Sequence, residues 1–376
     1  MTGTIPQAPH MPSVPPVLSD PHSAAPGRLP PPGAELGFEQ TVPRALAHRR
    51  QVGEVFVTDS AQGSDDDFHL AFQIPRAHSL WSDRRAGFHD PLASAEAARQ
   101  SIFVLLHRHV GVPVGLPFSL QRITLRVTDP SAYAHDGTSA LQGYVHYRVA
   151  ERQGKGSDVV SMVLDGTMEI GGRRAMALSA VLAFMSQEDY DVFRAYQRAR
   201  KPVAEARPTP ARRLGAALVG RENPRNVVVG LPEREPWPDD ASGAGGTFRC
   251  LLAADPHHPA FFDHEYDHVP GPLMVEGMRQ AAVAAACRAG ALAAPHALAV
   301  GCEAAFLDFA EFEADLVHEA EVGAPGADGR VPVAVVLRQF GKPVVEGRVD
   351  LLPEPARPDP GRPGPLPPST ARAHGV

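Results

Sequence analysis

One short motif occurs twice in the chain, half a chain length apart. The first copy reads HDPLASAEAARQ (89–100) and the second DHVPGPLMVEGMRQAA (267–282). They share the core E-x-x-R-Q, whose members are Glu96, Arg99 and Gln100, then Glu276, Arg279 and Gln280. The copies are 180 residues apart, whereas solenoid repeats run about 20–50 residues. The sequence therefore predicts a duplicated small domain, with a helix carrying an acidic residue in each half.

Composition excludes several classes of protein. A chain of 376 residues is long enough for about two domains, and 43% hydrophobic residues can form a core. The net charge of −7 gives no sign of a nucleic-acid groove or a basic membrane face. No apolar run approaches the ~20 residues that span a bilayer, and no secretory signal is visible. The three cysteines lack CxxC spacing, so we expect a cytoplasmic protein without disulfides or a metal site.

Proline-rich segments predict the domain boundaries. Residues 1–35 and 353–376 are rich in Pro and poor in large apolar residues, so we expect disordered tails. The stretch 201–245 is also Pro-rich, and we expect it to connect the halves and to contain one short strand at 226–229. The two folded domains are then expected at 36–200 and 246–352.

Both halves show the same order of hydrophobic patterns. Helical spacing predicts helices at 91–109, 187–199 and 270–289. Period-two alternation and turn residues predict strands at 54–58, 68–74, 118–128, 139–151, 157–170 and 173–185, then at 247–253, 296–308, 314–323, 331–339 and 343–351. One long helix followed by several antiparallel strands, twice, is an α+β arrangement. We predict a tandem (double) hot-dog fold, with each helix wrapped by a curved sheet and a pseudo-two-fold axis between the halves.

Several short blocks resemble one protein family. They are FVTD (56–59), IPRAHS (74–79), FHDPL with E-x-x-RQ (88–100), GVPVG (111–115) and HPAFFDHEYDHVPGPLMVEGMRQAA (258–282). In this order they resemble the A-factor biosynthesis (AfsA-like) hot-dog proteins over about residues 36–352. The resemblance implies an acyltransferase of γ-butyrolactone autoregulator biosynthesis that needs no cofactor. It would transfer a β-ketoacyl group from acyl carrier protein to the hydroxyl of dihydroxyacetone phosphate.

The second copy also resembles the more distant β-hydroxyacyl-carrier-protein dehydratases, which carry H-F-P-G-x-P-x-M-P-G-V-L-x-x-E. Pro270, Gly271 and Glu276 match the last part of that pattern. His264 lies two residues short of the dehydratase His spacing, and the local Gly is missing. The resemblance makes His264 a candidate acid or base, while the departure weakens the case for dehydration.

Glu276 is the main candidate for a general base. Attack of an alcohol on a thioester requires a base, donors for the oxyanion and a grip on the phosphate. Glu276 has neighbours such as Met274 and Met278, so we expect burial to raise its pKa. The structural alternative is an acid that favours the helix dipole, worth about 0.3–1 kcal/mol. Glu96, among smaller residues, is the second catalytic candidate.

Arg279 and Arg99 each follow a glutamate by three residues, on the same helix face. A planar guanidinium suits phosphate, which makes both arginines candidates for binding the acceptor. The alternative is a local Glu–Arg ion pair that lowers the pKa of the glutamate and spoils it as a base. Arg221 and Arg225 are further basic residues, and we expect most such arginines to be solvated surface charges.

Four more residues are candidates for supporting roles. Gly271 at the helix start can leave backbone N–H groups free for a thioester oxygen, or simply form a turn. His268 and Asp267 precede that helix, and His78 is the first-half candidate, or else a polar residue at a strand end. The His264–His268 spacing before a Pro-Gly helix start does not favour a metal site.

Two other functions fit the same residues. A hot-dog thioesterase or dehydratase would act on acyl thioesters without the phosphorylated acceptor. A non-catalytic acyl- or lactone-binding regulator would use the acids structurally. No GxSxG, phosphate loop or dinucleotide fingerprint is present, and no DNA-binding motif is visible. The family resemblance implies β-ketoacyl acyl carrier protein and dihydroxyacetone phosphate as partners, and we expect neither nucleic acid nor a membrane.

Overall fold

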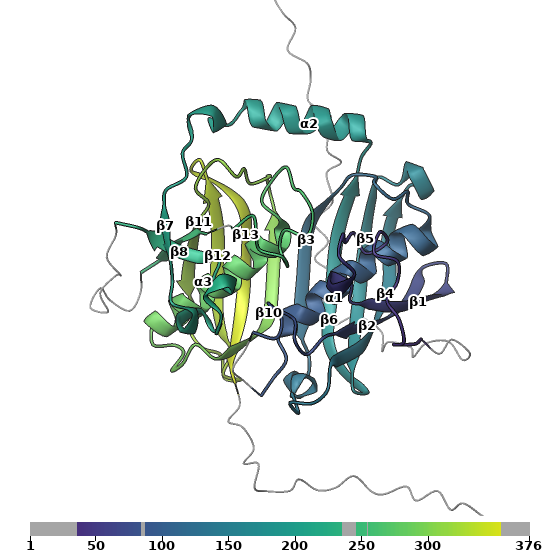
Figure 1. Ribbon diagram of the computed structural model, residues 1–376, viewed down its shortest axis with the longest axis horizontal. Helices are drawn as coiled ribbons and strands as arrows, with labels where there is room; N and C mark the ends of the chain where they lie inside the picture. Colours follow the sequence, from purple (N-terminus) through teal and green to yellow (C-terminus); the bar gives the residue numbers. More distant parts are fainter. Residues whose placement is uncertain (1–35, 84–86, 235–245, 254, 355–376) are drawn as a thin grey trace, which may run out of the picture.

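The computed structural model describes residues 36–83, 87–234, 246–253 and 255–354 (Figure 1). The N-terminal tail predicted at 1–35, and nearly all of the C-terminal tail predicted at 353–376, lie outside the described residues. None of the helices in the described part of the chain is both long and apolar enough to cross a membrane.

The described strands form one antiparallel sheet of 13 strands. The first half contributes β1 (Val57–Ser64), β2 (Asp67–Ile74), β3 (Phe118–Val127), β4 (Leu141–Gln153), β5 (Ser161–Ile170) and β6 (Arg173–Phe184). The second half contributes β7 (Ala211–Arg213), β8 (Val229–Pro232), β9 (Phe248–Leu252), β10 (Ala297–Phe306), β11 (Val317–Val322), β12 (Val331–Gln339) and β13 (Lys342–Pro353).

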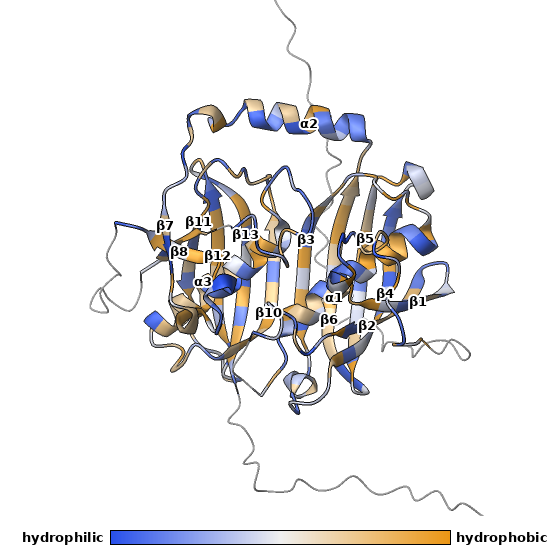
Figure 2. Cartoon of the chain, in the orientation of Figure 1, coloured by the Kyte–Doolittle hydropathy of each residue, from blue (hydrophilic) through white to orange (hydrophobic). Residues whose placement is uncertain are grey.

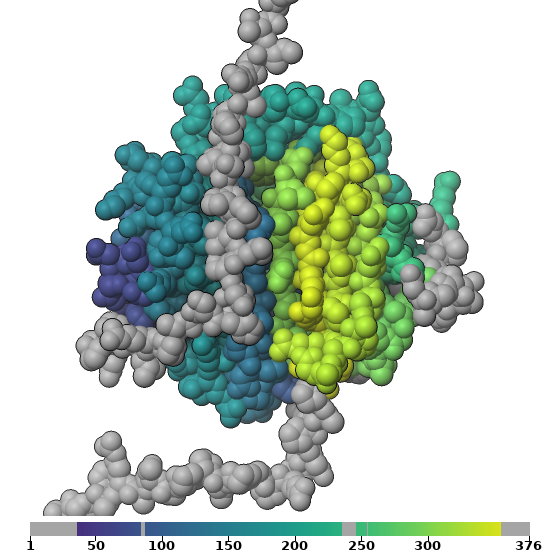
Figure 3. Space-filling view, turned by 180° about the vertical axis from the view of Figure 1, so that it is seen from behind, coloured from purple at the N-terminus to yellow at the C-terminus, as the bar shows by residue number. Residues whose placement is uncertain are grey.

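The strand order is symmetric about the junction of β3 and β10, with β7 as an additional strand at one edge. It runs β1-β2-β4-β5-β6-β3-β10-β13-β12-β11-β9-β8-β7, so each strand from β1 to β6 has a counterpart at the mirrored position in the order. The halves join where β3 pairs with β10, with Thr124 opposite Glu303. This order, with one helix against each half, is the pseudo-symmetric tandem hot-dog that the sequence predicts. The view from behind shows residues of both halves of the sheet at the surface of that face (Figure 3).

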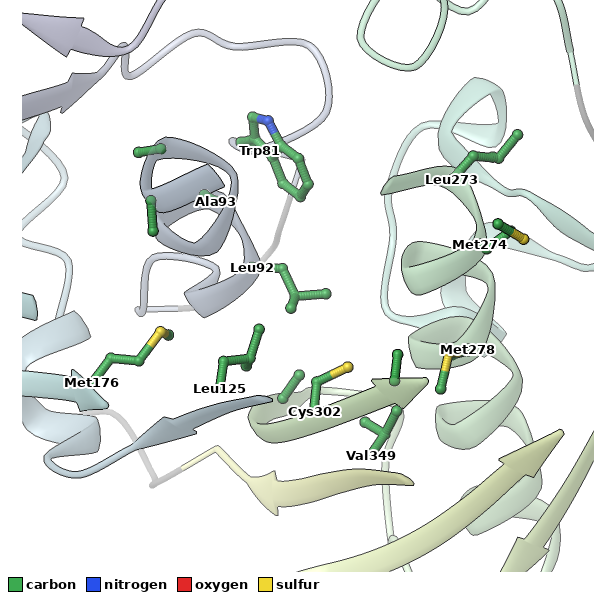
Figure 4. Close-up of a cluster of buried hydrophobic side chains, with 14 of the residues drawn as sticks. Trp81, Leu92, Ala93, Leu125, Met176, Leu273, Met274, Met278, Cys302 and Val349 are labelled. Carbon is green, nitrogen blue, oxygen red and sulfur yellow. The ribbon is translucent and has the colours of Figure 1, made fainter. Parts of the chain in front are cut away.

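Helices α1 (Pro91–Leu105) and α3 (Gly271–Arg288) lie on the same face of the sheet, one against each half (Figure 1). Small and apolar residues around most of the helix circumference allow each to be buried on nearly all sides. Between the two helices, Leu92 lies above Leu125 and Cys302 of the two central strands, and Met278 of α3 lies near Val349 (Figure 4). Helix α1 continues as a π-helical turn, Leu106–Val110, so the predicted end near residue 109 is confirmed.

Helix α2 (Gln187–Ala199) connects the halves and crosses one end of the molecule (Figure 1). Its N-terminus is capped by Ser186, whose Oγ accepts from Asp189 N at 3.0 Å. The helix is largely hydrophilic (Figure 2), and Arg194 is its one buried residue.

The described part of the stretch 201–245 differs from the sequence prediction. It contains two short strands, β7 and β8, and residue 226 ends a 3-10 turn (Pro224–Asn226) instead of starting a strand. Leu214 N donates to Val229 O at 3.0 Å, as Val42 N donates to Val57 O at 3.0 Å. These residues therefore repeat the start of the first half. Their pattern was missed because the strands are short and lie among Pro and Gly.

Candidate active site

The first copy of the motif forms a buried ion-pair cluster on α1. Glu96 is 7% exposed, and Arg99 one turn later donates to it through Nε at 2.8 Å and Nη2 at 2.9 Å. Gln100 Nε2 donates to the same carboxylate at 2.9 Å. Arg49, from the segment before β1, donates its Nη2 to Glu96 Oε1. We call Arg49, Glu96, Arg99 and Gln100 the first cluster.

The second copy builds the same arrangement on α3. Glu276 is 1% exposed and accepts hydrogen bonds from Arg279 Nε at 2.8 Å and Nη2 at 2.7 Å. Gln280 Nε2 donates to it at 2.6 Å, and Arg221 Nε donates at 3.0 Å. We call Arg221, Glu276, Arg279 and Gln280 the second cluster. Arg221 is 3% exposed, so its expected place on the solvated surface is wrong.

Arg49 and Arg221 are not part of the E-x-x-R-Q repeat, and the contacts of the two glutamines show why. Gln100 bridges Glu54 O at 2.9 Å and Phe56 N at 2.8 Å, whereas Gln280 bridges Asn226 O at 2.7 Å and Val228 N at 2.9 Å. These segments are 172 residues apart, although the helices are 180 apart. Arg49 lies six residues before the buried Val55, and Arg221 lies six residues before the buried Val227. Aligning these segments with an offset of 172 residues would have revealed the two arginines as a pair.

The predicted rise in the pKa of Glu276 is wrong. Burial alone would raise its pKa, but Arg221 and Arg279, with the hydrogen bond from Gln280, hold the pKa at about 2. Burial alone would also raise the pKa of Glu96, but Arg99 and Arg49 lower it to about 2. Both carboxylates are therefore ionised near neutral pH and are too weakly basic to accept a proton from an alcohol.

The loop before each central helix crosses to the other half. Asp263 in the second half accepts from Arg50 N at 2.5 Å and Gln51 N at 3.1 Å. Asp83 in the first half accepts from Glu222 N at 3.1 Å and Asn223 N at 3.0 Å. Each cluster is thus covered by a loop from the other copy, and the loop that follows Asp263 covers the first cluster.

His264 lies in the loop that covers the first cluster. Its side chain is 29% exposed, and its ring centroid is 4.2 Å from that of Tyr266. Burial and the nearby Arg49 guanidinium lower the pKa of His264, so the imidazole is neutral near pH 7. The structure therefore brings His264 near Arg49 and Arg99 of the first cluster.

The second cluster is closed by residues of the first half. Arg221 Nη1 donates to Leu80 O at 3.0 Å and lies 3.3 Å from Asp90 Oδ2. Asp90 is 1% exposed and caps α1 by accepting from Leu92 N at 3.0 Å. The equivalent residue before α3 is Pro270, which offers no carboxylate to Arg49. Two carboxylates thus face two guanidinium groups in the second cluster.

The arginines of the first cluster are more exposed than those of the second. The side chain of Arg99 is 22% exposed, against 2% for Arg279. Arg49 Nε is buried and has no hydrogen-bond partner among the described residues, whereas the equivalent Arg221 Nε donates to Glu276. Arg221 Nη2 also lacks a hydrogen bond, but it lies 2.8 Å from Glu276 Oε1 as an ion pair. An unpaired buried N–H group is costly unless a ligand or water pairs with it. The first cluster is therefore partly open to solvent, and the second is sealed from it.

Asp267 and His268 face α2. Asp267 accepts from Tyr190 Oη at 3.0 Å and Arg194 Nε at 3.0 Å. His268 Nδ1 lies 2.6 Å from Asp267 Oδ1, and its ring meets that of Phe309 at 4.5 Å. Burial alone would raise the pKa of Asp267, but His268 and Arg194 together lower it. Both residues anchor the loop that carries His264, and neither contacts a cluster.

His78 is an anchor within its own half. Its Nδ1 accepts from Leu80 N at 3.2 Å and Trp81 N at 3.1 Å, so Nε2 carries the proton and donates to Glu54 at 3.1 Å. Its counterpart His258 lies 2.9 Å from Asn226 in the same way. The repetition of this contact in both halves indicates a structural role.

Gly271 is the first residue of α3, whose N-terminus has no side-chain cap. A Cβ at this position would lie 3.6 Å from Phe306, an ordinary contact, so space alone does not require glycine. Helix α1, by contrast, is capped by Asp90. Among the residues that the structure describes, no group of His, Cys, Asp and Glu side chains is placed to hold a metal ion.

Comparisons with known proteins agree with this internal repeat. The A-factor biosynthesis hotdog domain (AfsA) matches residues 33–181 and again residues 203–353. A 2-oxo-3-(phosphooxy)propyl 3-oxoalkanoate synthase from Streptomyces virginiae is 32% identical over 244 residues, covering 65% of this chain and 76% of the relative. A protein of the same name from Streptomyces coelicolor is 31% identical over 310 residues, covering 81% of this chain and 90% of the relative.

Solved structures show a more distant likeness. A putative thioesterase from Novosphingobium aromaticivorans covers 79% of this chain and 98% of its own, with 13% identity and a TM-score of 0.44. A hot-dog protein from Alicyclobacillus acidocaldarius has 12% identity, the same TM-score of 0.44, and covers 79% of this chain and 96% of its own. Neither likeness bears on activity. The two family matches span most of the chain, and the protein therefore belongs to the A-factor biosynthesis (AfsA) hotdog family.

Proposed function

We propose that this protein transfers a 3-oxoacyl group from a thioester, carried on acyl carrier protein, to the primary hydroxyl of dihydroxyacetone phosphate. The product named for the relatives, a 2-oxo-3-(phosphooxy)propyl 3-oxoalkanoate, is the ester of these two components. A 3-oxoacyl donor and a triose phosphate acceptor are cytoplasmic metabolites, which agrees with the location that the sequence predicts.

The first cluster is the proposed site of the reaction. The observation that carries this proposal is the difference in exposure between the clusters: the side chain of Arg99 is 22% exposed, against 2% for Arg279, and Arg49 Nε beside it has no hydrogen-bond partner among the described residues. Two guanidinium groups face one glutamate there, so an added phosphate would be attracted and would complete the hydrogen bonds. Glu96 holds both arginines in place instead of accepting a proton.

His264 is the proposed general base. As the acceptor's hydroxyl oxygen attacks the thioester carbonyl carbon, its proton moves to the neutral imidazole, the C–O bond forms and the C–S bond breaks. The proton then passes to the departing thiolate. A phosphate bound by Arg49 offsets the charge that lowers the pKa of His264, so acceptor binding strengthens the base.

The start of α3 is the proposed place for the developing oxyanion. Gly271 follows the loop that carries His264, and its helix end has no side-chain cap to occupy the first N–H groups. The positive end of the helix dipole favours negative charge at this position. Glu276 and Arg279 are assigned a structural role, since the side chains of the second cluster are sealed from solvent.

Mass spectrometry of the products tests the proposal. Purified protein should form the phosphorylated ester only when the 3-oxoacyl thioester and dihydroxyacetone phosphate are both supplied. His264→Gln should reduce its rate by about 10²–10⁴-fold, whereas the control His257→Gln, at an exposed position in the same segment, should not. Release of free 3-oxo acid at a rate independent of the acceptor would indicate a thioesterase and reject the proposed transfer.

A further inference from the structure

His48 has an unusual backbone conformation beside the first cluster. Its φ is 51°, in the left-handed region that favours glycine, and among the described non-glycine residues only Phe340 shares it. The equivalent residue in the second half is Gly220, with φ 69°. The turn is the same in both halves, because Arg49 N donates to Arg44 O at 2.9 Å and Arg221 N to Ala216 O at 3.0 Å. The first half therefore keeps a strained histidine where glycine would serve.

The ring of His48 belongs to a stack that only the first half has. It lies on Phe103 with centroids 4.5 Å apart and planes at 18°, and the guanidinium of Arg99 lies 4.9 Å from the centre of the same phenyl ring. The second half has Val283 in place of Phe103 and Cys287 in place of His107. The stack is thus built from three substitutions that distinguish the copies.

His107 fixes the orientation of this ring. His107 Nδ1 lies 2.8 Å from Val112 O and must donate to it, so its Nε2 accepts. His48 Nε2, 2.6 Å away, is then the donor. Burial, His107 and Arg99 lower the pKa of His48 to about 3, so His48 stays neutral and places no extra charge beside the arginine.

The arginines of the two clusters differ at this point. Arg279 Nη2 donates to Val219 O at 3.1 Å, and a Cβ on Gly220 would lie 3.6 Å from Arg279 Nη1. A Cβ alone would make only an ordinary contact with Arg279, so only a side chain that extends beyond Cβ would compete with Arg279 for the main chain. In the described first half, the carbonyl of Ala47 receives no such bond from Arg99, which lies over Phe103 and is partly exposed.

We propose that His48 is a positioning residue, which holds Arg99 away from the main chain and keeps its guanidinium available for the phosphate of the acceptor. This inference rests on the proposed function for the identity of the ligand, a small phosphate monoester. The strain at His48 is retained because glycine would let Arg99 bond to the backbone, as its twin does.

The substitution His48→Gly tests this directly, because it gives the first half the residue of the second. We expect a folded protein in which the KM for dihydroxyacetone phosphate rises on the order of ten-fold, with the KM for acyl thioester unchanged. A crystal structure of the variant should show Arg99 donating to Ala47 O. Phe340→Gly is the matched control, since it removes the other left-handed side chain and should leave both KM values unchanged.

Binding of inorganic phosphate, followed by calorimetry, separates this inference from the reaction. Weaker phosphate binding by His48→Gly supports the inference even if wild type forms no ester, an outcome that would reject only the proposed function. Equal phosphate binding by wild type and His48→Gly, or none by wild type, overturns the inference. If His48→Gly does not fold, His48→Asn tolerates the left-handed conformation, lacks the ring and should show the same loss.

Discussion

The two clusters each consist of two arginines, a glutamate and a glutamine, but they differ in accessibility. In the second cluster Arg221 binds Glu276 and also reaches Asp90 at 3.3 Å, so the internal carboxylate occupies the place of an external anion. In the first cluster Pro270 stands where Asp90 would, and Arg49 Nε has no partner among the described residues. The difference teaches that a repeated motif does not imply a repeated function, because one capping residue can seal one copy.

The sealed cluster connects the two halves. Arg221 joins Asp90, which caps α1, to Glu276 on α3, and its side chain is fully buried. Breaking a buried ion pair by removing one partner is strongly destabilising, because the remaining charge stays buried. The second cluster therefore contributes to stability and to the relative placement of the helices, while the first is the proposed binding site.

The largest expected effect is on stability, at Arg221. Arg221→Met leaves two buried carboxylates with only Arg279 to offset them, so the free energy of unfolding should fall by about 3–5 kcal/mol. Urea denaturation followed by circular dichroism measures it. Arg49→Met is the matched variant in the first cluster, where Glu96 keeps Arg99 and Gln100, and it should lose clearly less. Equal losses at both positions would remove the distinction between a sealed and an open cluster.

An intermediate effect is expected on substrate affinity, at Arg49. Arg49→Met should raise the KM for dihydroxyacetone phosphate about ten- to a hundred-fold, because a charged contact to phosphate contributes about 1.5–3 kcal/mol. The KM for acyl thioester should change little. Steady-state kinetics with each substrate varied in turn measures both values, with Arg50→Met, at the exposed neighbouring residue, as control. A rise in the two KM values together would argue against a phosphate contact.

The smallest expected effect is on the pH profile. His264 must be neutral to accept a proton, so kcat/KM should be constant at neutral pH and fall as pH drops through its pKa, which burial and Arg49 hold below the ordinary value of about 6.5. Arg49→Met removes one of these causes, so the acid limb should move to higher pH. A limb that stays in place, or moves to lower pH, would show that His264 is not the base beside Arg49.

The sequence predicted much of the fold for physical reasons. The strands at 118–128 and 173–185 and the helix at 270–289 are long and strongly periodic, and the structure has β3, β6 and α3 there. The stretch 201–245 was harder, since its strands are too short to show a period. Its start repeats the first half in a register that differs by eight residues from the helices.

The site was only partly predictable, because its charges come from distant segments. The sequence indicated Glu276 and Arg279 as a pair, but Arg221, 55 residues earlier, could not be placed beside them. Without that second guanidinium, burial alone suggested a raised pKa, the opposite of the value of about 2. His264 was identified through a resemblance, yet its position over the other half's cluster depends on the crossing loop fixed by Asp263.

The most direct test of the account is a crystal structure of the protein with dihydroxyacetone phosphate bound. The account predicts one molecule per chain, with its phosphate against Arg49 Nε and Arg99 and its hydroxyl toward His264. The second cluster should keep the contact between Arg221 and Asp90 unchanged. A phosphate bound at Arg221 and Arg279, with Asp90 displaced and the first cluster empty, would contradict the central claim that the first cluster is the working site.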